Sequence, residues 1–225
     1  MKKLFPILTM RTMTKNTLII IFAMFFAIGF VSTIAKAGET KIIATFADPV
    51  QITPIIPLFT VNLSTDTITG GWADGKMGLY LQIPYSGNNY SDAFFTMTDV
   101  PYTGNIYGGA TGGGTVKFFA YGQSTSETPL IQIDFDSGSV NPYGLGGMDE
   151  FFANGVVISG SEIGAVVLSD EYFSFSFANQ KALSGNWNNG YTATSAFTSS
   201  AMVPEPAMIA ILSLGGLSLI RRKNK

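Results

Sequence analysis

The chain has 225 residues, with 15 acidic and 13 basic side chains, and it has neither cysteine nor histidine. These absences exclude disulfides, Ser-His-Asp and Cys-His catalytic centres, and zinc sites built on imidazole or thiolate. The length suffices for one domain together with processing segments at its ends.

The first 37 residues have the pattern of a secretory signal peptide. A basic stretch precedes the apolar run at 18–31, and Ala35 and Ala37 place small residues just before Gly38. The secretion machinery and signal peptidase recognise this order of segments. We therefore expect residues 1–37 to be a signal peptide that is cleaved before Gly38. An uncleaved N-terminal anchor is the alternative.

The region that follows is strongly acidic. Between Gly38 and Met202 there are 14 acidic residues, four lysines and no arginine, which gives a net charge near −10. The remaining positive charge lies at the two ends of the chain, as the positive-inside rule predicts for ends that face the cytoplasm. An acidic domain repels phosphate backbones, so nucleic acid is excluded as a partner.

Apolar and polar residues alternate through 38–198, the predicted exported domain. Period-two alternation predicts strands with one packed and one solvated face, and it is clearest at 79–83, 131–135 and 173–178. Turns rich in glycine and asparagine separate these strands. The further expected strands are 41–46, 59–64, 93–98, 115–121, 156–159, 165–169 and 191–197. We expect an all-β fold, an antiparallel β-sandwich with a jelly roll as one version.

Two segments of this domain are expected to depart from the strand pattern. Residues 104–114 contain several glycines and are predicted to be a mobile loop. Residues 148–154 are predicted to form one turn of helix.

The C-terminus has three successive parts. A Ser/Pro stalk at 199–206 carries a Val-Pro-Glu-Pro motif, an apolar run at 207–220 follows, and a basic tail at 221–225 ends the chain. We expect the apolar run to be a transmembrane helix, which proline separates from any upstream helix and which the basic tail holds on the cytoplasmic side. The motif residues are Val203, Pro204, Glu205 and Pro206. The basic residues that stop the helix are Arg221, Arg222 and Lys223.

This tripartite tail resembles that of the PEP-CTERM family. The resemblance implies processing by an exosortase-type membrane enzyme in a Gram-negative bacterium, in systems that accompany exopolysaccharide and biofilm production. It implies a protein that is transiently in the inner membrane and then at the cell surface or in the extracellular matrix. The resemblance covers only the tail and says nothing about 38–202. The alternative is an ordinary inner-membrane anchor that carries a periplasmic β-domain.

Acidic residues in the central region supply the candidate metal site. Asp134 and Asp136 are two positions apart beside a turn glycine, a spacing that calcium loops use. Further oxygens would have to come from the acidic pairs at 149–150 or 170–171. A solvated strand end is the favoured interpretation, and no other cofactor is expected.

Two kinds of activity remain open for the central domain. Paired carboxylates can hydrolyse glycosidic bonds without histidine, so a glycoside hydrolase is the alternative to a protein that is not an enzyme. Aromatic side chains in turn-rich segments can stack on sugar rings, which makes exopolysaccharide a candidate ligand. The aromatic candidates are Trp72, Tyr80, Tyr85, Tyr90, Tyr102, Tyr107, Tyr121, Tyr143 and Trp187.

The short length of the apolar run at 207–220 predicts that the C-terminal tail is removed by proteolysis. As a helix its 14 residues, 207–220, span about 21 Å, whereas the hydrocarbon core is about 30 Å thick. A short span suits an intermediate that a membrane enzyme cuts. Replacing Glu205 and both motif prolines with alanine should trap the full-length chain in the inner membrane, and removing 204–225 should release it to the periplasm. Mass spectrometry of the exported protein provides the check, and retained Arg221 and Arg222 would contradict processing.

Overall fold

The computed structural model describes residues 38–47, 57–72, 78–141 and 149–204. The predicted signal peptide, Glu205 and Pro206, the predicted membrane helix and the basic tail lie outside the described residues, and they stay predictions. None of the helices in the described ranges is long and apolar enough to cross a membrane.

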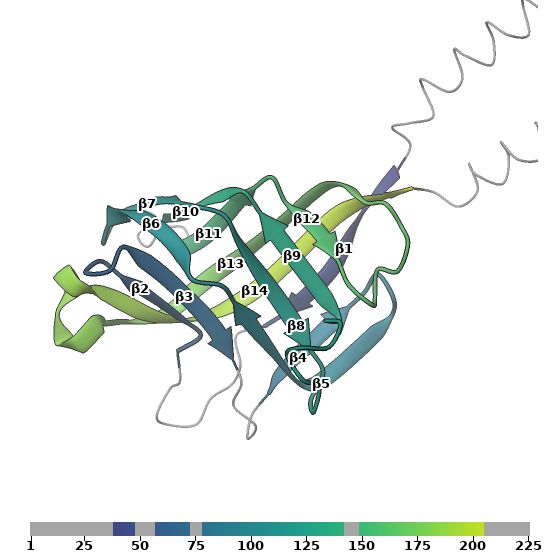
Figure 1. The fold of residues 1–225 in the computed structure, drawn as a ribbon, viewed down its shortest axis with the longest axis horizontal. Coiled ribbons are helices and arrows are strands. Elements are labelled where there is room, and N and C mark those ends of the chain that lie inside the picture. The colour runs from purple at the N-terminus through teal and green to yellow at the C-terminus, as the bar shows by residue number, and fades with distance from the viewer. Residues whose placement is uncertain (1–37, 48–56, 73–77, 142–148, 205–225) are drawn as a thin grey trace, which may run out of the picture. The chain divides into compact units, whose positions relative to one another are not determined.

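The described residues form antiparallel β-structure, as the alternation of apolar and polar residues predicts (Figure 1). The strands are β1 (Gly38–Phe46), β2 (Phe59–Asn62), β3 (Thr67–Trp72), β4 (Leu79–Ile83), β5 (Asn88–Met97), β6 (Val100–Asn105), β7 (Gly108–Thr111), β8 (Gly114–Phe119), β9 (Ile131–Phe135), β10 (Ser137–Asn141), β11 (Asp149–Asn154), β12 (Val157–Ser159), β13 (Ser169–Ala182) and β14 (Gly190–Pro204). Two short 3₁₀ helices, η1 (Leu183–Gly185) and η2 (Trp187–Asn189), connect the last two strands.

The strands pair in the order β12-β9-β8-β5-β4-β1-β14-β13-β11-β10-β7-β6-β3-β2, with further pairings between β5 and β3 and between β14 and β2. The hairpin of β13 and β14 is the longest pairing, in register from Ser169 opposite Met202 to Ala182 opposite Tyr191, with two register shifts. Strand β14 also pairs with β2 and lies next to β1. Among the described strands, β14 therefore connects the first two, β1 and β2, to β13.

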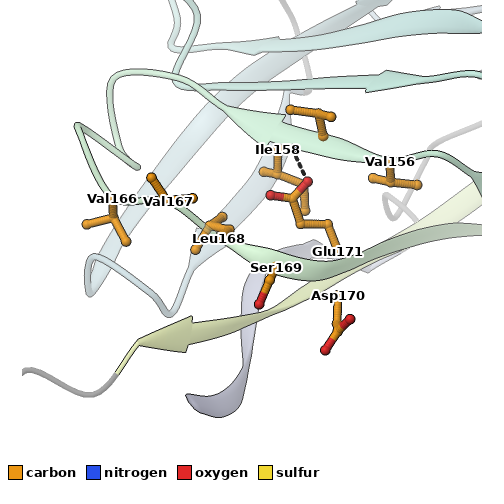
Figure 2. A pocket seen from close by; sticks show the side chains of 9 residues that line it. Val156, Ile158, Val166, Val167, Leu168, Ser169, Asp170 and Glu171 are labelled. Carbon is orange, nitrogen blue, oxygen red and sulfur yellow. Dashed lines mark hydrogen bonds between the residues drawn. The ribbon is translucent and has the colours of Figure 1, made fainter. Parts of the chain in front are cut away.

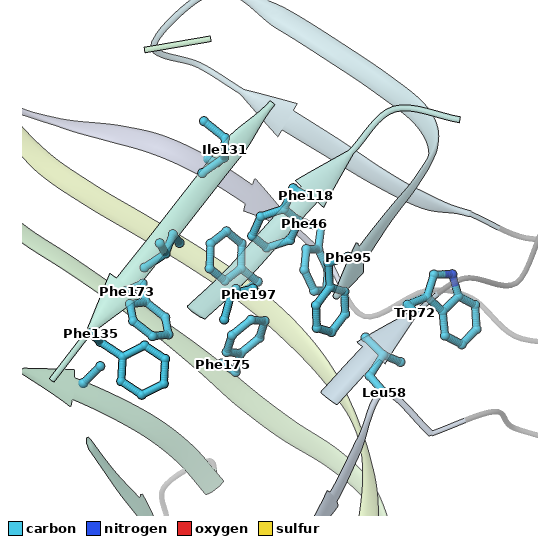
Figure 3. Packing of buried hydrophobic residues seen from close by; sticks show 14 of the residues in the cluster. Phe46, Leu58, Trp72, Phe95, Phe118, Ile131, Phe135, Phe173, Phe175 and Phe197 are labelled. Atoms are coloured by element: carbon cyan, nitrogen blue, oxygen red, sulfur yellow. The ribbon is translucent and has the colours of Figure 1, made fainter. Parts of the chain in front are cut away.

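Phenylalanine fills the core (Figure 3). Phe175 of β13 is fully buried, with ring centroids 4.8 Å from Phe59, 4.9 Å from Phe197 and 5.8 Å from Phe95. Phe118 of β8 lies 4.8 Å from Phe197 of β14. The inward rings of β5 and β8 thus pack against those of the β13–β14 hairpin. Rings at these distances and tilts pack favourably beyond the area that they bury.

The glycine-rich segment at 104–114 is ordered strand structure, so the prediction of a mobile loop was wrong. Its residues end β6, form β7 and begin β8. A Cβ at Gly104 would come 2.5 Å from the backbone oxygen of Gly108, and one at Gly109 would come 2.4 Å from that of Thr103. Glycine is required here because the two backbones of the hairpin lie too close for a side chain.

Two further local predictions were also wrong. The expected helical turn at 148–154 is strand β11 from Asp149 onward, paired with β10 and β13. Residues 165–168 form no strand, because β13 begins only at Ser169. Both segments are short, and a short apolar stretch does not show whether its residues repeat with the period of a helix or with that of a strand.

The predicted stalk is part of the folded unit as far as Pro204, where β14 ends. Ser199 is fully buried, and its Oγ accepts a hydrogen bond from Ala44 N at 3.1 Å and lies 3.2 Å from Ala44 O, to which it donates. Ala201 is buried as well. Small residues let β14 approach β1 closely, and the same composition is typical of a tether. The first two motif residues, Val203 and Pro204, are the last two of this strand.

Replacing Phe175 with alanine should lower the free energy of unfolding by about 3–5 kcal/mol, because it removes a ring that several neighbours enclose. Urea unfolding followed by fluorescence measures the change, since Trp72 is buried. Tyr80→Ala is the control, because Tyr80 is 57% exposed on β4 and should change stability by less than about 0.5 kcal/mol. Equal losses in the two variants would contradict a core centred on Phe175.

Candidate functional site

Three turns meet at one end of the described strands and form what we call the three-turn end. They are residues 63–66 between β2 and β3, 106–107 between β6 and β7, and 183–189 between β13 and β14. Figure 1 shows all three on the left of the view. Backbone hydrogen bonds between residues far apart in sequence bring the turns together. Leu63 N donates to Asn189 O at 2.9 Å, and Tyr102 N donates to Asp66 O at 2.8 Å.

Each of these turns is held by an asparagine side chain that accepts a backbone N–H. Asn62 Oδ1 accepts from Ser64 N at 2.9 Å. Asn105 Oδ1 accepts from Tyr107 N at 2.7 Å, and Asn186 Oδ1 does the same for the N–H of residue 188 at 3.0 Å. Asparagine is favoured in turns because its short side chain can replace a backbone acceptor. The amide Nδ2 donors are not used by these turn contacts.

Two aromatic side chains are exposed on the turns. Tyr107 is 70% exposed, and Trp187 is 37% exposed with its ring 6.4 Å from that of Tyr191. Tyr102 is buried beneath the β6–β7 turn, where its hydroxyl donates to Asn105 O at 2.7 Å. Burial raises the pKa of Tyr102, and this hydrogen bond opposes the shift. Tyr102 therefore supports the turn, while Tyr107 and Trp187 present flat apolar surface to solvent.

The other aromatic candidates do not belong to the three-turn end. Trp72 is buried in the core. Tyr80 and Tyr121 are exposed, but Tyr80 lies on β4 and Tyr121 follows β8 in the turn before β9. Tyr85 and Tyr90 pack partly buried against the core. Tyr143 lies outside the described residues.

The candidate calcium ligands are already engaged or exposed. Asp134 accepts hydrogen bonds from Thr115 Oγ1 at 2.6 Å and from Gln132 Nε2 at 2.8 Å. Asp136 is exposed just after β9. Throughout the described ranges, no three His, Cys, Asp or Glu side chains form a group that could hold a metal ion. Asp134 is half-buried within β9, where it lies opposite Thr115 of β8 and Val157 of β12. The side chains of the pair at 149–150 lie outside the described residues.

A carboxylate network joins the β4–β5 hairpin to the loop before β13. Glu162 accepts hydrogen bonds from the Tyr90 hydroxyl and from Asn88 Nδ2, the latter at 2.8 Å. Burial raises the pKa of Glu162, but hydrogen bonds from Ser86, Tyr90 and Asn88 outweigh it and hold the pKa below its ordinary value. The hydrogen bond to Glu162, then burial and charge repulsion, raise the pKa of Tyr90 to about 12.

A groove of about 420 Å³ lies between β12 and the start of β13 (Figure 2). It is lined by Val156, Val157, Ile158, Val166, Val167, Leu168, Ser169, Asp170 and Glu171. Glu171 Oε2 accepts from Ile158 N at 3.0 Å, and burial, which this bond partly offsets, raises the pKa of Glu171. Figure 2 shows Glu171 directed toward β12 and Asp170 directed away from it. These two carboxylates do not face each other across the groove.

Comparison with protein-family models gave no match, and neither did comparison with curated proteins or with solved structures. Functional interpretation of the central domain therefore depends on its own geometry.

Sequence reasoning identified the aromatic residues of the three-turn end but not their grouping. The signal that was missed is the repeated use of asparagine just before or within a turn, at 62, 105 and 186. Each of these positions is a local turn signal. That the three turns adjoin follows only from the pairing of β14 with β2 and of β3 with β6.

Glu162→Gln should lower the free energy of unfolding at pH 7 by about 1 kcal/mol or less, because the network is partly solvated. A folded-state pKa below the ordinary value of 4.5 means that the ionised form stabilises the fold above pH 4.5. This contribution is lost as the pH falls through the folded-state pKa, so the two proteins should converge in acid. Urea titrations across this pH range provide the measurement.

Glu171→Gln is the matched control. The pKa of Glu171 in the parent chain is raised. The contribution of its protonated form to stability is therefore present below the ordinary pKa and is lost as the pH rises through the folded-state pKa. Glutamine keeps an acceptor for Ile158 N and carries no charge. Its stability at pH 7 should therefore equal or exceed that of the parent chain. If Glu171→Gln lost as much stability at pH 7 as Glu162→Gln, the inference that the two carboxyl pKa values are shifted in opposite directions would be contradicted.

Proposed function

We propose that this chain is an exported surface or extracellular-matrix protein whose domain, a β-sandwich, binds polysaccharide through the three-turn end. This proposal is carried by the exposed Tyr107 and Trp187, which lie on two of the three adjoining asparagine-held turns. Calcium, a catalytic carboxylate pair and nucleic acid have no part in it.

The chemistry of the three-turn end suits a sugar polymer. Tyrosine and tryptophan rings offer flat apolar faces on which a pyranose ring can stack. Amide and hydroxyl groups beside them can exchange hydrogen bonds with sugar hydroxyls. The exposed polar residues of the turns are Ser64, Thr65, Asp66, Asn105, Ser184, Asn186 and Asn188. Because the turns are held by their own side chains, binding costs little conformational entropy.

Ring contacts between strands that are not neighbours in the pairing order support a sandwich. Inward rings of β5 and β8 meet those of β13 and β14, as sheets packed face to face require. Loops at one end of such a fold are the usual place for a binding site, because the sheets hold them rigidly.

Delivery by an exosortase-type enzyme is the second part of the proposal. It is supported by the Val-Pro-Glu-Pro motif, the short apolar run and the basic end of the sequence. In the folded unit, β14 ends at Pro204, so the motif continues directly from a paired strand. A processing enzyme would then act next to the folded domain, because Glu205 directly follows Pro204 in the sequence.

Tyr107→Ala and Trp187→Ala should each weaken polysaccharide binding by about tenfold, which corresponds to 1.4 kcal/mol. Affinity electrophoresis in gels that contain neutral glucans, galactomannan or anionic exopolysaccharide measures the effect. Tyr121→Ala is the matched control, because Tyr121 is also 70% exposed but lies in the turn after β8. Binding to none of these polymers, or equal loss in all three variants, would contradict the proposed site.

A further inference from the structure

The groove at β12 is bordered by backbone that is paired on one side only. In the described part of the chain, β12 is the terminal strand of the pairing order, next to β9. Val157 and Ser159 lie opposite Asp134 and Gln132. In an antiparallel ladder, the residue between two hydrogen-bonded positions directs its N–H and C=O to the other side. Ile158 is that residue, so its N–H faces the groove.

Glu171 occupies the place where an adjacent strand would accept this N–H. Its Oε2 lies 3.0 Å from Ile158 N, as the dashed line in Figure 2 marks. The ladder of β13 with β14 shifts register between Ser169 and Tyr172, and Asp170 between them has a φ of 48°. Bulges and charged side chains are devices that keep a strand edge from pairing. Here the protecting group is a flexible side chain, which an incoming strand can displace.

The surface beside this edge is apolar with acidic groups. Val157, Val166 and Val167 are 55%, 42% and 80% exposed. Asp170 and Glu171 are the acidic residues of the lining, with the Glu171 carboxylate directed toward β12, and no lysine or arginine contributes to the lining. A segment with valine-like side chains and a cation therefore complements the groove, whereas a second acidic surface is repelled.

We propose that the groove binds an extended segment of a partner protein, apolar at alternate positions and carrying lysine or arginine. The segment adds to β12 as a further strand, a recognised mode of peptide binding. Its backbone pairs with Ile158, its apolar side chains cover the exposed valines, and its cation pairs with the displaced Glu171 carboxylate. A second copy of this chain is a poorer occupant, because the domain carries a net charge near −10.

A labelled peptide, TVKVKVT, tests the proposal by fluorescence anisotropy with the full chain in detergent micelles, measured relative to empty micelles. The peptide should bind, and TVEVEVT should bind about fivefold more weakly or not at all, as expected for a partly exposed ion pair. A TVKVKVT peptide with N-methyl groups on alternate amides should not bind, because it cannot form the ladder. No binding of TVKVKVT at millimolar concentration overturns the proposal, as does equal binding of the methylated peptide.

Val157→Lys places a cation on the free edge and should abolish binding of TVKVKVT. Ile42→Lys is the matched control, because Ile42 is 50% exposed on β1, outside the groove, and its variant should bind as the parent does. Equal binding by the two variants overturns the site. If light scattering shows a dimer that Val157→Lys dissociates, the occupant is a second copy and the proposal is wrong.

Discussion

Burial of phenylalanine between the β13–β14 hairpin and the strands opposite it is the interaction on which the rest of the described structure depends. The chain has no cysteine to form a disulfide. Within the described ranges, one ion pair is present, between Lys41 and Glu39 at 3.4 Å, and both side chains are solvated. Such a pair contributes little. The hydrophobic effect and ring packing must therefore offset the entropy of ordering the strands. Serines on β14, such as Ser199, are buried only because each finds a backbone partner.

How far the sequence predicts this fold depends on whether a signal is local. The alternations at 79–83, 131–135 and 173–178 identified three strands and their buried faces, because a period of two is a property of neighbouring residues. The β6–β7 hairpin was missed, because its glycines allow two backbones to lie close together and do not mark a mobile loop. Strand β14 was predicted too short, because the small polar residues of a buried strand and of an exposed tether look alike in sequence.

The candidate site also combines local features, which the sequence reveals, with long-range features, which it does not. Asparagine in a turn and an exposed tyrosine are local features, and the sequence presents both. Whether an aromatic side chain is on the surface is not local, since Trp72 and Tyr102 are buried while Tyr107 and Trp187 are exposed. The meeting of the three turns depends on hydrogen bonds such as Leu63 N to Asn189 O, more than a hundred residues apart. Such pairings follow from the packing of the whole domain, which no short stretch of sequence encodes.

The position of β14 has a consequence for the order in which the domain can form. Of the described strands this one is synthesised last, yet it pairs with β13 and β2 and adjoins β1. Until β14 is available, β1 has only β4 and β2 has only β3 as a strand neighbour, and the Phe197 ring is missing from the core. Contacts between segments far apart in sequence require closure of a long loop, and a fold rich in such contacts forms slowly. The described domain can therefore complete its fold only after all of β14 has been synthesised.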